Sequence, residues 1–199
     1  MKAVDIIYKV CRMLGMDDYV LELDKYYLAK STNGSYTIPD GIKTKLNEFI
    51  MSINDATEHI AYYKEVFLIT ETLESDEDGL IDYSLFKHTP IKVCGVYGEN
   101  GVEEKRFLLL PFALKVWDAC TKKTICYSFM PERIKDIEAE VNIPRTYAEA
   151  ATVYLVCYYV LMERNLYDEC QVWLDKFNDY VAKKAVDKKS RYLKSSPLI

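Results

Sequence analysis

The sequence has few of the residues on which most enzymes depend. Histidine occurs twice, at His59 and His88, and glycine only seven times in 199 residues. It contains no Gly-rich phosphate loop, no GxSxG nucleophile motif and no HExxH zinc motif. Two histidines without paired cysteines do not supply the usual ligand set of a zinc site. We therefore expect a chain that is not an enzyme and that needs no cofactor and no metal.

Export and membrane signals are also lacking. The six cysteines include no Cys-x-x-Cys pair, and several lie in apolar runs such as 156–158, which predicts buried free thiols rather than disulfides. The first 14 residues resemble an amphipathic helix rather than a signal peptide. The longest apolar stretch, 148–162, is tyrosine-rich and shorter than the roughly 20 residues that cross a bilayer. We expect a protein made in a reducing cytoplasm, with no membrane partner.

Charge is unevenly distributed along the chain. The net charge is -5, but residues 183–194 hold six Lys or Arg against one Asp, which leaves 20 basic and 30 acidic residues elsewhere. An acidic body argues against tight nucleic-acid binding, because that requires basic surface to displace counterions. Tyrosine is abundant, at 17 residues. Two interpretations are open. Either the tyrosines provide contact surface for partner proteins, or their number reflects an AT-rich coding sequence.

We consider three groups of polar residues as possible metal-binding or catalytic sites. The acidic segment 74–79 resembles a calcium loop, but Leu85 stands where a bidentate Glu is required, so we expect a solvated hairpin turn. Either histidine could be placed in a catalytic device, although no motif surrounds it. The carboxylates Glu103, Glu104 and Asp118 leave the alternative of a small enzyme that works with carboxylates.

Helical periodicity marks the first third of the chain. Val4, Ile7 and Cys11 are spaced as on one helix face, and Gly15 is a suitable end for that helix. A second, long helix is predicted from Asp40, with an apolar stripe (Ile42, Leu46, Phe49, Ile50, Ile53, Thr57 and Ile60). The intervening residues 16–38 are mixed, and we expect a helical turn only at 26–28.

The middle of the chain changes to the period of β-strands. Strands are predicted at 66–72, 80–86, 91–97, 105–110, 112–117 and 124–130. Asn100-Gly101 is a hairpin signal between the third and fourth of them. The spacing is typical of a small antiparallel sheet or sandwich.

Helical periodicity returns near the end. Thr146 to Glu149 forms a T-x-x-E capping box, and the helix that follows, to about residue 163, is apolar around most of its circumference, so we expect it at the centre. A last helix over about 167–184 presents one apolar face, for which core packing is the favoured role (Cys170, Trp173, Leu174, Phe177 and Val181).

The predicted fold class is α+β: a helical bundle with a small antiparallel β-sheet or sandwich insertion and an extended C-terminal tail. Residues 1–65 and 132–186 form the two halves of the bundle. Residues 66–131 form the β insertion, and residues 187–199 form the tail.

The stretch 145–182 resembles the closing helical pair of the head-to-tail adaptor (connector or neck) proteins of tailed bacteriophages. The resemblance lies in an Ala-Glu-Ala helix start at 148–150, a break at Asn165, and an acidic-Cys-x-x-Trp segment at 168–173 followed by Phe177. Upstream, 50–63 is similar to the long second helix of that family, and Pro90–Val93 and Phe129–Pro131 are similar to its strand insertion. The acidic 71–79 turn and the tyrosine-rich central helix depart from it.

The resemblance implies a structural virion protein. Such adaptors form a ring, commonly of twelve subunits, between the portal protein and the tail or nozzle proteins, and the ring extends the DNA channel. Neighbouring copies are then partners, DNA passes without specific binding, and the location is the neck of the virion after synthesis in the bacterial host cytoplasm. An acidic body fits this role because it repels the DNA backbone.

The tail is the predicted portal-binding segment. Its candidate residues combine basic and apolar side chains: Arg191, Tyr192, Leu193, Lys194, Leu198 and Ile199. Burying each aliphatic side chain would contribute about 1.5–3 kcal/mol before ordering costs. A frayed, solvated terminus is the alternative. For the whole chain, the alternatives are a non-viral cytosolic protein–protein interaction module and another virion part such as a stopper or tail-completion protein.

Overall fold

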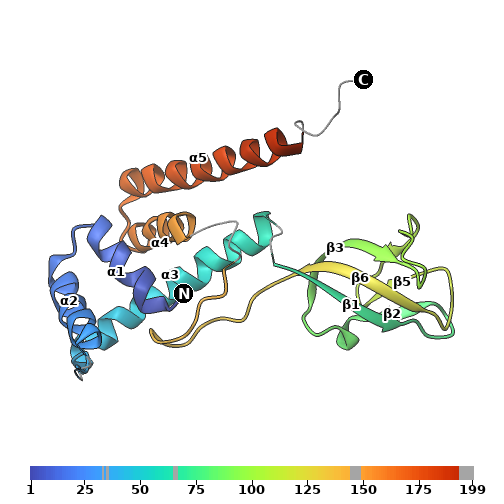
Figure 1. Cartoon of the computed structure of the whole chain (residues 1–199), viewed down its shortest axis with the longest axis horizontal. Helices are drawn as coiled ribbons and strands as arrows, with labels where there is room; N and C mark the ends of the chain where they lie inside the picture. The colour runs from blue at the N-terminus through green and yellow to red at the C-terminus, as the bar shows by residue number, and fades with distance from the viewer. Residues whose placement is uncertain (33, 35, 65–66, 144–148, 193–199) are drawn as a thin grey trace. The chain divides into compact units, whose positions relative to one another are not determined.

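The computed structural model describes residues 1–32, 34, 36–64, 67–143 and 149–192 (Figure 1). The chain forms two compact units. The helical unit comprises Met1–Thr57 and Arg133–Ile199, and the β unit comprises Glu58–Glu132. The element order confirms the predicted α+β class, with the strands inserted between helices.

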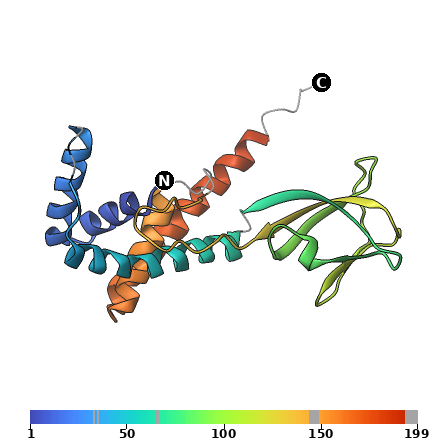
Figure 2. The ribbon, with the colours of Figure 1, turned by 90° about the horizontal axis from the view of Figure 1, so that it is seen from below.

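The described residues of the helical unit form five helices, and the third continues into the residues of the β unit. They are α1 (Ala3–Met13), α2 (Asp17–Ser31), α3 (Asp40–Lys64), α4 (Glu149–Glu163) and α5 (Tyr167–Tyr192). Helix α4 is the most enclosed, and it is buried at Ala151, Leu155, Cys157 and Val160 among others, as its apolar circumference predicts. Helices α4 and α5 lie side by side and are antiparallel in both views (Figures 1 and 2).

The long helix and the last helix follow their sequence patterns. Six of the seven predicted stripe residues of α3 are buried, with only Ile42 half-buried. Cys170 and Phe177 of α5 are buried, and Trp173, Leu174 and Val181 are half-buried. Gly15 ends α1 with a φ of 65°, a left-handed conformation that favours glycine. The capping box at 146–149 falls largely outside the described residues.

Two helices are longer than the sequence predicts. Residues 16–38 contain α2, a helix of 15 residues, where a single turn is predicted. Only Leu23 of this helix is buried, so its apolar period is weak. Helix α5 continues to Tyr192 instead of ending near 184, so the extended tail does not begin at 187. Four of the eight added residues, Ala185, Lys188, Lys189 and Arg191, have high helix propensity.

The chain returns from the β unit along the first helix. Main-chain N–H groups of Ala3 and Val4 donate to the carbonyls of Ala139 and Ile137 at 2.9 and 2.8 Å, and Val141 donates to Met1 at 2.8 Å. The side chain of Asn54 on α3 both donates to and accepts from the main chain of Ile134, at 3.0 and 2.9 Å. These bonds close the helical unit across a long sequence separation.

The β unit consists of two three-stranded antiparallel sheets. The first has the order β1-β6-β3 and the second β2-β5-β4. The strands are β1 (Leu68–Glu74), β2 (Leu80–Asp82), β3 (Pro90–Tyr97), β4 (Leu108–Leu109), β5 (Ala113–Lys115) and β6 (Lys122–Phe129). Their shared core includes Ile81, Leu114, Ile125 and Tyr127. The unit therefore has a core of its own.

Several predicted strands are shorter in the structure. The 80–86 strand ends at Asp82, because the Asp82 carboxylate accepts from the Ser84 N–H at 2.7 Å and caps a 3₁₀ turn, η1 (Tyr83–Leu85). The Asn100-Gly101 turn is formed, with Gly101 at a φ of 73°. However, this turn does not join two strands that pair with each other. Its flanks form one bridge, Tyr97 to Glu103, before β3 and β4 enter different sheets.

Removing the Phe177 ring tests the helix α4–α5 core. Phe177 is fully buried, so we expect Phe177→Ala to lower the free energy of unfolding by about 3–5 kcal/mol. The matched control on the same helix is Val172→Ala, which is exposed and should change it by no more than about 0.5 kcal/mol. Urea unfolding followed by circular dichroism measures both, and equal effects would contradict this assignment of the core.

Candidate interaction surfaces

The predicted portal-binding residues lie at the end of the chain. Arg191 and Tyr192 form the last residues of α5. Leu193, Lys194, Leu198 and Ile199 lie outside the described residues. The structure therefore brings none of the six into a described contact, and their role stays a prediction.

A groove opens in the helical unit where two helix connections meet. Its volume is about 540 Å³. The lining residues come from the end of α1, the α1–α2 turn, the end of α4 and the start of α5: Met13, Leu14, Gly15, Met16, Leu161, Arg164, Leu166, Glu169, Val172, Trp173 and Lys176. Most of these residues are apolar. Trp173 alone was considered from the sequence for a partner groove, with core packing favoured, and the others come from three separate segments that the sequence does not connect.

Three charged side chains border this groove. Arg164 and Lys176 are basic and Glu169 is acidic. The Lys176 ammonium lies 3.9 Å from the centre of the Trp173 ring, a cation–π contact. Trp173 also lies 6.0 Å from Tyr154 of α4. Trp173 thus serves both the helix packing predicted for it and the wall of the groove.

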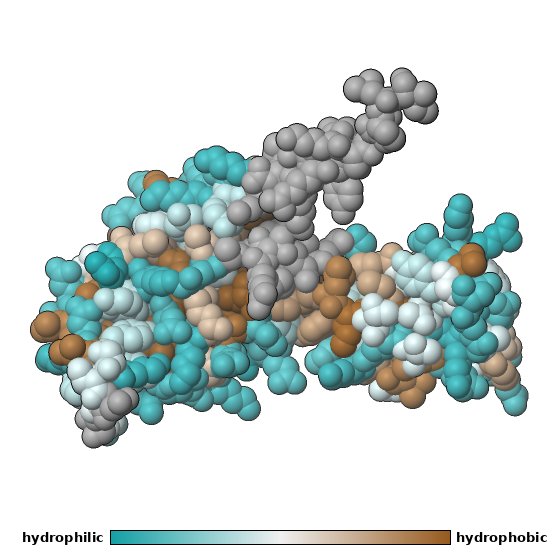
Figure 3. All heavy atoms as spheres, in the orientation of Figure 1, coloured by the Kyte–Doolittle hydropathy of each residue, from teal (hydrophilic) through white to brown (hydrophobic). Residues whose placement is uncertain are grey.

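The β unit carries a second set of exposed apolar side chains. Leu108, Leu109, Phe112 and Trp117 are exposed on β4 and around β5, and Phe112 is 60% exposed. The Tyr83 N–H donates to the Phe112 carbonyl at 3.0 Å, so the η1 turn that bears exposed Leu85 adjoins the β4–β5 turn. Brown, apolar side chains accordingly reach the surface of both units in Figure 3. Contiguous exposed apolar patches are common at protein–protein interfaces.

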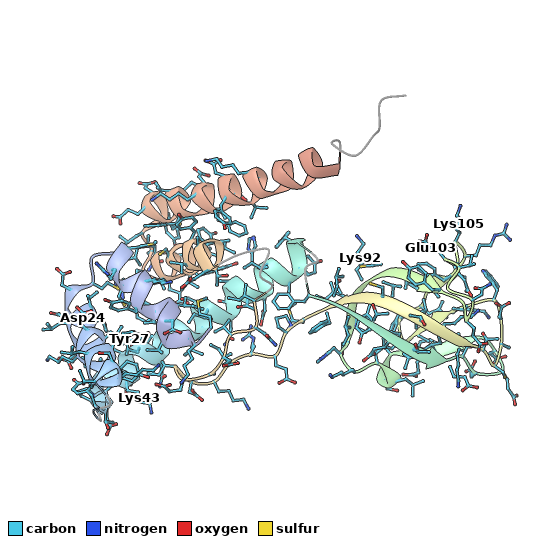
Figure 4. All side chains as sticks on the ribbon, in the orientation of Figure 1. Asp24, Tyr27, Lys43, Lys92, Glu103 and Lys105 are labelled. Carbon is cyan, nitrogen blue, oxygen red and sulfur yellow. The ribbon has the colours of Figure 1, made fainter. Side chains whose placement is uncertain are left out.

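The carboxylates proposed for an enzyme are held in a cross-link. The Lys123 side chain is only 4% exposed and its ammonium donates to Asp118 at 2.8 Å and to Glu104. Burial lowers the pKa of Lys123, but the hydrogen bonds to Asp118 and Glu104 raise it more, so that the net shift is upward. The charged lysine therefore ties two loops together. Glu103, labelled on the 98–105 loop in Figure 4, is exposed.

The histidines and the acidic turn have structural partners. The His88 ring stacks on Phe129 with 4.3 Å between ring centres, and His59 lies 4.7 Å from Tyr63. The Asp76 carboxylate accepts from the N–H groups of Asp78 and Leu80 at 2.9 and 2.7 Å. Asp76 thus shapes the turn, which links the two sheets instead of forming a hairpin. In the described part of the chain, no three His, Cys, Asp or Glu side chains gather as metal ligands.

All six cysteines are free thiols. Cys11, Cys157 and Cys170 are buried as predicted, and burial raises the pKa of Cys11 and of Cys157 to about 12. Cys94 and Cys120 are exposed, so the prediction of burial is wrong for these two. They lie on the strand and loops of the β unit, where side chains alternate between core and solvent.

Tyrosines hold the helix α2 in place. Tyr27 of α2 donates to Asp5 of α1 at 2.5 Å, and Tyr8 of α1 donates to Asp24 of α2 at 2.5 Å. Tyr26 donates to Glu138 on the returning chain at 2.9 Å. Figure 4 shows Asp24 and Tyr27 on this helix. Part of the tyrosine excess thus serves bonds inside the fold, a use that neither sequence interpretation included.

No protein-family model matches this chain, and the search of curated proteins finds no match either. Among the helices of the described residues, none combines the length and the apolar character needed to cross a bilayer.

Alkaline titration tests the Tyr27–Asp5 bond. Burial and then the hydrogen bond to Asp5 raise the pKa of Tyr27 well above its ordinary value of 10.0. The protonated phenol is therefore favoured in the fold, so its stabilisation is present below pH 10 and is lost as the pH rises above that. We expect Tyr27→Phe to cost about 1 kcal/mol at pH 7.

The same variant should show a shallower fall of unfolding free energy with pH above pH 10 than the wild type. Urea unfolding at a series of pH values measures both slopes. Tyr62→Phe is the control, because Tyr62 is exposed and lies in the β unit. Parallel slopes for the wild type and Tyr27→Phe would contradict the bond's contribution.

Proposed function

We propose that this chain is a structural virion protein, a head-to-tail adaptor that forms a ring between portal and tail and extends the DNA channel. One observation carries the proposal. The helical unit is assembled from two chain segments, and the β unit inserted between them has its own core. This order of helix, long helix, strand insertion and helix pair is the order that the resemblance implies.

The surfaces support a subunit with several partners. Exposed apolar side chains occur on the helical unit around the groove and on the β unit around Phe112. A ring subunit needs separate surfaces for its two neighbours and for the portal and tail or nozzle proteins. Acidic groups outnumber basic groups outside 183–194, which allows DNA to pass the channel without being bound. In this proposal the protein resides in the neck of the virion.

The end of α5 carries the portal contact in this proposal. Basic residues continue along the helix up to Arg191, and the apolar residues Leu193, Leu198 and Ile199 follow. Basic and aliphatic groups on one short segment suit a groove on the portal that has an apolar floor and an acidic rim. Repetition around a ring would strengthen each weak contact through avidity.

Substituting the aliphatic residues tests this contact. We expect Leu193→Ser, Leu198→Ser and Ile199→Ser together to weaken attachment to purified portal roughly tenfold or more, because the apolar area is lost. The matched control in the same segment is Ser195→Ala with Ser196→Ala, which should attach like the wild type. Cosedimentation with portal rings measures attachment.

Two outcomes would count against the proposal. Wild-type protein that does not cosediment with portal would remove the adaptor function. Attachment that is equal in the triple serine variant and the wild type would keep the function but remove the terminal segment from it. Binding to tail proteins alone would point instead to a stopper or tail-completion role.

A further inference from the structure

Helix α2 carries a stripe of exposed side chains, of which Asp24 also accepts the hydrogen bond from Tyr8 of α1. Asp17, Leu21, Asp24, Leu28 and Ser31 recur every three or four residues and therefore share one face, which we call the α2 stripe. Leu21 is 59% and Leu28 is 67% exposed, and the buried residue of this helix, Leu23, lies on the opposite side. Two leucines seven residues apart, so exposed, are typical of a helix that docks against a partner.

The groove of the helical unit is the counterpart of this stripe. It is concave, its lining combines apolar with charged side chains, and Met13, Leu166 and Val172 at its wall are themselves exposed. Its rim carries two cations, Arg164 and Lys176, against the single anion Glu169. The stripe is convex, apolar at two positions and acidic at two. Shape, polarity and sign of charge are therefore complementary.

The α2 stripe and the groove of one chain are too closely joined to meet each other, which leaves a second copy as the source of the stripe. The groove residues Met13 to Met16 directly precede α2, and the Tyr27–Asp5 and Tyr8–Asp24 bonds hold α2 against α1. The stripe therefore cannot swing into the groove of its own chain. Tyr8 donates to Oδ1 of Asp24, and within the described residues Oδ2 accepts no hydrogen bond, so it can face a cation.

We propose that the α2 stripe of one copy docks in the groove of the next. Leu21 and Leu28 stand about 10 Å apart along the helix and enter the apolar floor, while Asp17 and Asp24 face Arg164 and Lys176. The two surfaces differ, so the contact is head to tail and repeats, closing into a ring where the rotation permits. The inference rests on the proposed function for its setting, since it names the contact between ring neighbours.

Reversing the charges on either surface tests this contact. One variant carries Asp17→Lys with Asp24→Lys, and the other carries Arg164→Glu with Lys176→Glu. Alone, each variant opposes like charges, and its self-association constant should fall roughly tenfold or more. Mixed in equal amounts, the basic stripe of one meets the acidic groove of the other, and the reverse contact is also matched, so association should return.

Sedimentation velocity from micromolar to millimolar protein measures the association. Recovery on mixing separates the contact from loss of folding, because two misfolded variants would not restore each other. Leu21→Ser with Leu28→Ser should weaken association as well. The matched control is Met51→Ser, which removes an equally exposed apolar side chain (64%) of the helical unit outside both surfaces.

A wild-type chain that stays monomeric at millimolar concentration overturns the inference, and so does a mixture no more associated than its components. Neither result bears on portal attachment, which the cosedimentation measures separately. Conversely, a chain that associates through stripe and groove but ignores portal would retain the contact and lose the proposed function.

Discussion

The short return of the chain over residues 133–141 is the constraint on which the helical unit depends. The β unit separates the two halves of the helical unit by many residues, and closing so long a loop costs conformational entropy. Main-chain bonds from Ala3 and Val4 to Ile137 and Ala139, and the paired bonds of Asn54 to Ile134, offset that cost at the point of closure. Both α1 and α3 are thereby fixed to the chain that leads into α4.

Hydrogen bonds between polar side chains then position α2 against the rest of the helical unit. Tyr26 and Lys2 both reach Glu138 on the returning chain, and Tyr27 reaches Asp5, so α2 is positioned by hydrogen bonds more than by its single buried leucine. As a consequence, Leu21 and Leu28 of the α2 stripe remain exposed to solvent. In the β unit, the buried Lys123 performs a similar task for the loops that flank β4 and β5. Side-chain hydrogen bonds within the chain thus help to determine which apolar groups remain exposed.

Elements with a strong apolar period could be predicted from the sequence, as α3 and α4 show. Helix α2 and the end of α5 could not, because their helical residues are held by polar bonds or by propensity, which leave no apolar repeat. Which strands pair with each other could not be predicted from the sequence either. Asn100-Gly101 predicts a turn correctly, yet whether β3 then pairs with β4 or β6 depends on packing between the sheets. The groove could not be predicted, because its walls come from three separate segments of the chain. The α2 stripe that we propose to bind it could have been identified from the Asp17–Leu21–Asp24–Leu28 spacing.

In the proposed function, the molecule is one repeating part whose exposed surfaces are filled by other subunits. Cryo-electron microscopy of portal rings incubated with an excess of this chain tests that proposal most directly. We expect a continuous ring of additional density on one end of the portal, with the channel open through it and neighbouring copies in contact through their helical units. Bare portal rings beside free monomers would contradict it.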